Sequence, residues 1–169
     1  MLSNTLSQST IRTPLGNMIA IASAKGLSVL SFEEEETFFD QKIGCYAQYK
    51  FTRAHQQILK VTEDWLKAYF SKTLKLAAMP PVDLQGTDFT VRAWKQLLKV
   101  PFGKTATYGA LALKIGSPKA ARAIGRAMGQ NRIAILLPCH RIVGSNGTLT
   151  GYSAGLRRKQ WLLQHEGLR

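Results

Sequence analysis

Cysteine is scarce in this sequence, which holds only Cys45 and Cys139 among its 169 residues. Two cysteines so far apart form neither the dense disulfide framework of a small secreted domain nor the paired ligands of a structural zinc site. In the first half, Cys45 and His55 are the only soft ligands, too few for such a site. We therefore expect free thiols and a protein of the reducing cytoplasm.

Long apolar runs are also absent. No stretch approaches the ~18–20 apolar residues that cross a bilayer, and the first residues lack the basic start and apolar core of a signal peptide. We expect no membrane partner. A content of 45% hydrophobic and 20% charged residues is typical of a globular chain with one domain or two small ones.

The second half of the sequence contains few acidic residues. Residues 1–86 hold 9 Lys or Arg and 8 Asp or Glu, whereas residues 87–169 hold 14 and 2. Of the net charge of +13, the second half therefore carries +12. A polyanion is the natural partner of such a surface, although a basic surface that only aids solubility has the same composition.

The first half shows strand signals followed by one helix. Turns at 14–16 and 25–26 separate three apolar or alternating segments, which predicts an antiparallel meander of strands over 5–13, 18–24 and 27–32. The acidic run 33–36 indicates a solvated edge or a helix start. Helical spacing predicts a helix over residues 55–70. Residues 71–88, with two adjacent prolines, are the expected connection between the halves.

The second half is predicted to be mainly helical, with helices over residues 89–98, 108–114, 118–128 and 156–165. Thr107 and Ser117 are the expected N-caps of the two central helices, with Pro118 at a first helical position. Two helices joined by a Gly-Ser turn form a helix-turn-helix candidate, a pattern that many helical hairpins share. We expect the run 133–137 to be buried, 144–155 to be a loop, and the last helix to bury Leu156, Trp161 and Leu162.

These patterns together predict an α+β fold in two domains. Residues 1–86 are expected to form an N-terminal α/β scaffold, an antiparallel sheet with one helix. Residues 87–169 are expected to form a mainly helical C-terminal domain that contains the helix-turn-helix.

Cys139 follows the apolar run and stands directly before His140 and Arg141. A cysteine attacks as the thiolate, and a nearby base or cation lowers its pKa. Glu166, one of two acids in the second half, could complete a relay of nucleophile, base and orienting group. The composition equally fits Cys139 as a small buried hydrophobe, His140 as a satisfied core residue and Glu166 as a helix-end charge.

The segment Pro138-Cys139-His140-Arg141 resembles the active-site signature of the O6-alkylguanine-DNA alkyltransferases, also called methylated-DNA–protein-cysteine methyltransferases. The resemblance covers about residues 87–167, whereas in residues 1–86 it is confined mainly to 13–16. Further segments fall in the family's order and spacing, namely 89–94, 101–109, 118–125, Asn131, 151–153 and 159–167.

The resemblance implies that Cys139 takes the alkyl group from O6 of guanine in DNA, with O4-alkylthymine as a further candidate substrate. His140 would act as base through a water and Glu166 would orient it. Tyr108 would donate to guanine N3 as the base leaves, and Asn131 would brace the turn before the active-site segment. The product is a thioether, so we expect one turnover per molecule, with no metal and no cofactor.

The implied partner is double-stranded DNA carrying O6-alkylguanine, bound by a monomer. A base inside the stack is out of reach of a buried thiolate, so Arg122 would enter the duplex from the minor groove as the guanine flips out. The other expected DNA-binding residues are Ala121, Ala123, Thr107, Ser117, Lys119, Arg126 and Arg132. The expected substrate-pocket residues are Ile142, Tyr152, Ser153, Met128 and Lys159.

Two positions depart from the family's pattern: Arg132 stands where many members have Pro, and Ala154 where many have Gly. The second leaves open which sizes of alkyl group fit. Three other functions were weighed. A non-catalytic lesion binder would lack Cys139, a helix-turn-helix transcription regulator would not need Pro138 to Arg141, and a cysteine hydrolase leaves the basic half unexplained.

Overall fold

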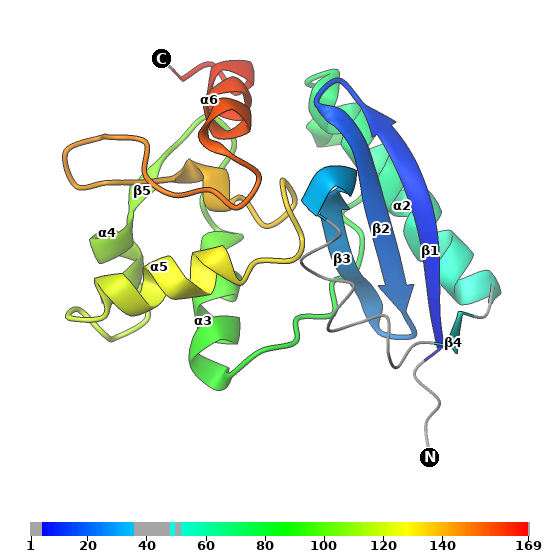
Figure 1. Ribbon diagram of the computed structural model, residues 1–169, viewed down its shortest axis with the longest axis horizontal. Helices are drawn as coiled ribbons and strands as arrows, with labels where there is room; N and C mark the ends of the chain where they lie inside the picture. The colour runs from blue at the N-terminus through cyan, green and yellow to red at the C-terminus, as the bar shows by residue number, and fades with distance from the viewer. Residues whose placement is uncertain (1–4, 36–47, 50–51, 169) are drawn as a thin grey trace. The chain divides into compact units, whose positions relative to one another are not determined.

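The computed structural model describes residues 5–35, 48–49 and 52–168. Two compact units make up the chain, Met1–Leu84 and Gln85–Arg169, and Figure 1 shows the sheet of the first and the helices of the second. Cys45 and Glu36, which the sequence predicts to be a free thiol and part of an acidic edge, lie outside the described residues. Across the described part of the chain, every helix is too short or too polar to cross a membrane.

The first unit is built on a four-stranded sheet. Its three long strands pair antiparallel as the predicted meander, and a short fourth strand that the sequence did not reveal pairs parallel with the first. In the order β3-β2-β1-β4, the strands are β3 (Gly26–Phe32), β2 (Gly16–Ser23), β1 (Thr5–Thr13) and β4 (Gln48–Tyr49). Ile19, Ile21 and Val29 form a buried apolar cluster on this sheet.

Gly26 opens β3 at a point of close backbone approach. Its φ is +151°, and a Cβ there would lie 2.6 Å from the carbonyl oxygen of Pro81. The Leu27 amide donates to that carbonyl at 2.8 Å, and the Asp83 amide donates to the Leu27 carbonyl at 2.8 Å. Part of the expected connection between the halves is therefore fastened along the edge of the sheet.

Helix α2 (Arg53–Phe70) packs against the three long strands, beside the sheet in Figure 1. The predicted helix over 55–70 is confirmed and begins two residues earlier, because Thr52 accepts a hydrogen bond from the His55 amide and caps it. Short 3-10 turns follow the sheet and the helix at Glu33–Glu35 (η1) and Leu74–Leu76 (η2). The buried face of α2 consists of His55, Ile58, Leu59, Thr62, Leu66 and Tyr69.

The second unit is mainly helical, as predicted. The indole Nε1 of Trp94 donates to the Ala127 carbonyl at 2.9 Å and ties the first helix of this unit to the third. Its elements are α3 (Asp88–Leu97), β5 (Ala106–Thr107), α4 (Tyr108–Lys114), α5 (Ala121–Gly129), η3 (Cys139–Arg141), β6 (Ile142–Val143) and α6 (Leu156–His165). The two short strands pair parallel and bring the start of α4 beside the segment after Cys139.

Two local predictions for this unit are wrong. Ser117 does not cap α5, which begins at Ala121; instead the Ala120 amide donates to the Ser117 carbonyl at 2.9 Å. Residues 117–120 thus close a turn in which Pro118 takes the second position, where its fixed φ is favourable. Leu156 is 49% exposed, whereas the neighbouring turn of α6 buries Lys159 completely.

Candidate active site

Cys139 lies at the end of a buried segment, as the first residue of η3, and is 5% exposed. The residues before it, 133–138, are all buried. Ile135 within them has a φ of +67° and no exposed surface. A β-branched residue in the left-handed region costs about 1–3 kcal/mol, and it persists where the surrounding packing fixes the chain. The thiol is therefore held on a tightly determined backbone.

Asn131 joins the end of α5 to this segment. Its amide nitrogen donates to the Leu137 carbonyl at 2.9 Å and to the Cys139 Sγ at 3.0 Å. Its amide oxygen accepts from the Ile133 amide at 2.9 Å. With 4% of its surface exposed, Asn131 both braces the turn and offers a hydrogen bond to negative charge on sulfur.

His140 is fully buried and faces Glu166, with 2.7 Å between Nε2 and Oε1. Burial lowers the pKa of His140, the positive charges of Arg141 and Lys159 lower it further, and Glu166 opposes them. A neutral imidazole that donates from Nε2 keeps a lone pair on Nδ1. Among the described residues, Nδ1 has no hydrogen-bond partner, so it is able to accept a proton.

Glu166 accepts hydrogen bonds on both carboxylate oxygens. Oε1 accepts from His140 and from Arg141 Nη2 at 3.0 Å, and Oε2 accepts from Arg141 Nε at 2.8 Å and from the Gly103 amide at 3.0 Å. Burial by itself raises the pKa of Glu166, but the hydrogen bonds and charges of His140 and Arg141 outweigh it and lower the pKa to about 2. The residue is therefore a carboxylate.

The depressed pKa of Glu166 predicts acid sensitivity. Its pKa is about 2 in the folded protein, against an ordinary value of 4.5. As the pH falls, the unfolded chain binds this proton first, so the stabilisation is full above about pH 4.5 and is lost toward pH 2. Chemical unfolding at a series of pH values should show a loss of about 3 kcal/mol across this window in wild type. A Glu166→Gln variant should lack it; an identical pH dependence in both proteins would contradict the assignment.

Arg141 makes contacts in the site that the sequence analysis did not predict. Besides its two bonds to Glu166, it donates from Nη1 to the Val100 carbonyl at 2.7 Å, and its guanidinium lies 5.8 Å from the centre of the Phe102 ring. Only 7% of the residue is exposed. The signal available in the sequence was the rarity of acids in a basic half, because a buried acid there calls for a cationic partner.

A cavity of about 130 Å³ opens at Cys139. Four expected site residues, Tyr108, Met128, Tyr152 and Ser153, line it together with the cysteine. Three glycines also line it that the sequence analysis did not assign to the pocket, Gly125, Gly129 and Gly151. The Tyr108 hydroxyl donates to the Thr150 carbonyl at a long 3.4 Å, so the tyrosine at the start of α4 meets the loop 144–155 across the cavity.

Ile142 and Lys159, which were also expected in the pocket, are not among its lining residues. Both are fully buried. Lys159 Nζ donates to the carbonyls of Ile142 and Thr150 at 2.6 Å and of Gly151 at 3.3 Å. Burial lowers the pKa of Lys159, while the negative charge of a Cys139 thiolate opposes that shift. The lysine therefore holds the loop 144–155 through its hydrogen bonds to the Thr150 and Gly151 carbonyls, and it places positive charge near the sulfur.

Lys159→Met should loosen this loop. The methionine keeps the length of the side chain but leaves three carbonyls without their donor, at a cost of about 1–3 kcal/mol in unfolding free energy. Urea unfolding measures the loss, and amide hydrogen exchange should show faster exchange over residues 148–152. Arg157→Met, at an exposed position of the same helix, should change stability by less than about 0.5 kcal/mol. Equal stability of the two variants would contradict the role of Lys159.

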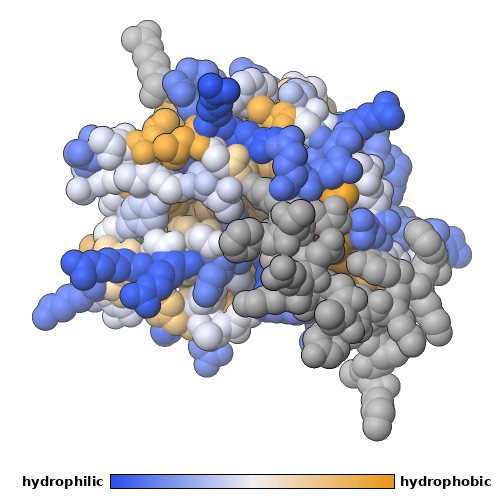
Figure 2. Space-filling view, in the orientation of Figure 1, coloured by the Kyte–Doolittle hydropathy of each residue, from blue (hydrophilic) through white to orange (hydrophobic). Residues whose placement is uncertain are grey.

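The residues expected to bind DNA divide into three groups. Lys119, Arg122 and Arg126 are exposed, and Figure 2 shows strongly hydrophilic side chains projecting where α4 and α5 lie in Figure 1. Ala121, Ala123 and Arg132 are half-buried. Thr107 and Ser117 serve the local backbone: the Thr107 hydroxyl accepts from the Ala110 amide and caps α4, and Ser117 closes the turn before α5.

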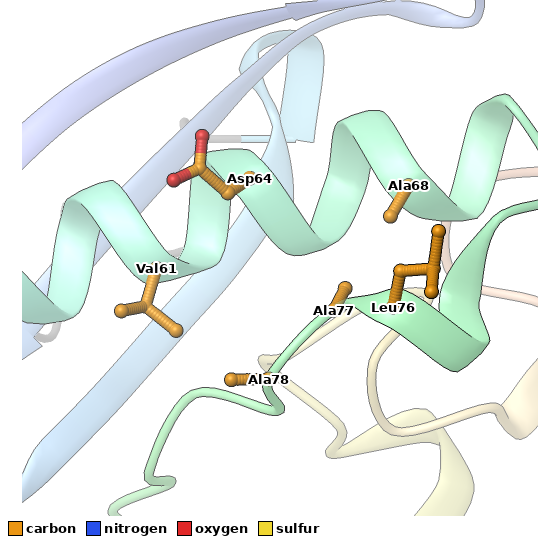
Figure 3. Close-up of a pocket in the computed structure, with 6 residues that line it drawn as sticks. All are labelled: Val61, Asp64, Ala68, Leu76, Ala77 and Ala78. Carbon is orange, nitrogen blue, oxygen red and sulfur yellow. The ribbon is translucent and has the colours of Figure 1, made fainter.

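A second hollow, of about 320 Å³, lies in the first unit between α2 and the segment after η2 (Figure 3). Its lining is apolar except for Asp64, which forms an ion pair with Lys60. The one reactive group of this cavity is a carboxylate held in an ion pair, whereas the cavity at Cys139 has a thiol with a histidine next to it in the chain, so the cavity at Cys139 is the candidate active site. The lining residues are Val61, Asp64, Ala68, Leu76, Ala77 and Ala78.

Known proteins resemble this chain over both halves. Residues 88–168 match the family model described as 6-O-methylguanine DNA methyltransferase, DNA binding domain. A methylated-DNA–protein-cysteine methyltransferase of Shigella flexneri is 38% identical over 164 residues, 96% of each chain. One of Mycobacterium bovis is 52% identical over 103 residues, 61% of this chain and 62% of its own length. The crystal structure of Mycobacterium tuberculosis OGT in complex with DNA matches with a TM-score of 0.79 at 38% identity, covering 93% of this chain and 90% of that one.

Proposed function

This chain belongs to the 6-O-methylguanine DNA methyltransferase family, and we propose that it repairs double-stranded DNA by moving the alkyl group of O6-alkylguanine onto Cys139. One observation carries the proposal: the buried Cys139 lies at a small cavity and accepts a hydrogen bond from Asn131, and the next residue is a histidine that a carboxylate orients. The positions of these groups fit an activated thiolate that meets an extruded base.

The chemistry is an in-line displacement. His140 Nδ1 takes the thiol proton through a water, and the Cys139 sulfur then forms a bond to the alkyl carbon. The bond from that carbon to O6 breaks, and its electron pair leaves with guanine. Tyr108 donates a proton to guanine N3 and is reprotonated from His140 through solvent. The net result is that the thiol proton moves to guanine. The products are unmodified guanine and an S-alkylcysteine.

The site favours negative charge on sulfur before the transfer. The Asn131 amide bonds to Sγ at 3.0 Å, and the Lys159 ammonium lies near enough to interact with the thiolate. Each of these groups stabilises the thiolate more than the thiol. The thioether product has no charge and no S–H proton to lose. It cannot become a thiolate again, so each molecule acts once.

The basic second unit supplies the DNA-binding surface in this proposal. Helices α4 and α5 act as a helix-turn-helix, and Arg122, exposed near the start of α5, enters the duplex from the minor groove. Residues 1–86 act as a scaffold and residues 87–169 carry DNA binding and transfer. All proposed catalytic groups belong to one chain, which fits a monomer, and a free thiol suits the reducing cytoplasm.

The fate of the lesion tests the proposal. A duplex with one O6-methylguanine is incubated with equimolar protein, and its nucleosides are then analysed. We expect O6-methylguanine to be converted to guanine, with no free methylated base released. A persistent lesion that the protein binds tightly would identify a non-catalytic binder. Preference for a sequence rather than for the lesion would identify a transcription regulator. Cys139→Ala is the matched control and should leave the lesion intact.

Tyr108→Phe should slow alkyl transfer by roughly 10²-fold. The phenyl ring still lines the cavity but no longer donates to the departing guanine, so the barrier rises while the docking surface is unchanged. Single-turnover rates and equilibrium binding to the same lesion duplex separate the two effects. An unchanged transfer rate would remove the role of the hydroxyl as a donor.

A further inference from the structure

Two cationic or basic side chains share one buried carboxylate. Glu166 Oε1 accepts from both His140 and Arg141, while Arg141 also reaches Oε2. The histidine alone would be enough to explain an orienting role for Glu166. The structure therefore raises the question of what the second, charged partner does for the reaction.

Arg141 is fixed in place by more than Glu166. It donates to the Val100 carbonyl and lies against the Phe102 ring, so its guanidinium has a single position. The planar fork of arginine matches a carboxylate in two parallel hydrogen bonds and remains protonated at any ordinary pH. Its positive charge therefore sits permanently beside the carboxylate that His140 uses.

We propose that Arg141 is a positioning residue that neutralises Glu166 and thereby keeps His140 an uncharged base. The inference rests on the proposed alkyl transfer, in which His140 receives the proton of Cys139. A carboxylate without a counter-charge stabilises an imidazolium, and a protonated His140 has no lone pair for that proton. With Arg141 in place, the buried pair of Glu166 and Arg141 is neutral, and it orients the imidazole without charging it.

Among the described residues, three further titratable groups lie near His140. Lys159 adds a second positive charge and disfavours the imidazolium. The Tyr152 ring stands edge-on to the imidazole, with 6.4 Å between ring centres, and brings no formal charge. Cys139 precedes His140 in the chain and becomes negative only when the proton leaves it. The titratable and charged groups concerned are Glu166, Arg141, Lys159, Cys139 and Tyr152.

The test is the titration of His140 in the resting protein, without DNA. Ring signals of the three histidines are assigned by single replacements of His55 and His165 with Gln, and followed from about pH 8 to about pH 5, which brackets the ordinary histidine pKa of ~6.5. In wild type we expect His140 to stay neutral. In Arg141→Met its protonation midpoint should rise by about 1–3 pH units, because the carboxylate is no longer neutralised.

Two further variants separate charge from packing. Arg141→Lys keeps the charge and should keep His140 neutral, although it lacks the fork. The double variant Arg141→Met with Glu166→Gln removes both charges together and should also keep His140 neutral. Arg141→Gln retains a donor for Glu166 and replaces the methionine variant if that variant does not fold. An unchanged titration in Arg141→Met or Arg141→Gln, or an equal rise in Arg141→Lys, would overturn the proposal.

The rate of transfer gives a second readout that a purely structural role would not move. With free O6-methylguanine as substrate, the transfer rate of Arg141→Met should be about tenfold lower than that of wild type for each pH unit below the raised midpoint of His140, and should approach the wild-type rate above it. A uniform loss at all pH values would overturn the role in proton affinity. The titration needs no alkyl transfer, so failure of the proposed function and failure of this inference are told apart.

Discussion

Replacing Glu166 with glutamine should slow alkyl transfer by roughly 10³-fold. The carboxylate accepts four hydrogen bonds, from His140, from two nitrogens of Arg141 and from the Gly103 amide. A neutral amide accepts on only one of its two atoms and presents a donor to the others. His140 then loses its fixed orientation, and Nδ1 is no longer held for the proton of Cys139.

The same substitution should lower the unfolding free energy by about 3–5 kcal/mol, because it leaves the buried Arg141 charge unpaired. Single-turnover rates and urea unfolding measure the two effects on one protein. Adding Arg141→Met removes the stranded charge, so the double variant should recover stability without recovering transfer. A Glu166→Gln protein that transfers the alkyl group at the wild-type rate would contradict the relay.

Arg122→Ala should weaken repair of a duplex by roughly 10²-fold while changing the reaction with free O6-methylguanine less than about twofold. Unstacking and unpairing a base costs a few kcal/mol, and each 1.4 kcal/mol is a factor of ten. Arg122 is exposed on α5 and is not among the residues that line the cavity. Its loss should therefore affect extrusion of the base and leave the chemistry at Cys139 intact.

Arg126 supplies the matched control, since it is exposed on the same helix one turn further along. Arg126→Ala should reduce binding to damaged and undamaged duplexes alike, with a lower salt dependence, as the loss of a phosphate contact does. Equal losses of Arg122→Ala on duplex and free base would refute its role in base extrusion. Rapid mixing of each variant with both substrates provides the comparison.

The sequence predicts the secondary structure well wherever a periodic pattern is long. The three strands of the meander and the helices α2 to α6 all have apolar residues at regular spacing, which the hydrophobic core requires. The sequence did not predict the two-residue strands β4, β5 and β6, because two residues are too few to show a periodic pattern. The start of α5 was placed too early because Ser117 and Pro118 suit a turn as well as a helix start.

The site was predictable in part. The motif around Cys139 and the acid at Glu166 predict the reacting groups by their resemblance to a family, and the structure brings Asn131 to the thiol and Tyr108 to the same cavity. The sequence placed Lys159 in the substrate pocket, whereas its bonds to three carbonyls and the role of Arg141 required coordinates. Hydrophobicity predicts that Lys and Arg lie on the surface, and both are buried here because carbonyls or a carboxylate accept their hydrogen bonds.

The mass of the intact protein after reaction with a duplex that carries one O6-methylguanine tests the central claim most directly. The account predicts a gain of a single methyl group in each molecule, located by peptide mapping on Cys139 and absent from Cys139→Ala. It also predicts that a second portion of damaged duplex produces no further change. A methyl group on another residue, or repair of several lesions by each protein molecule, would contradict the account.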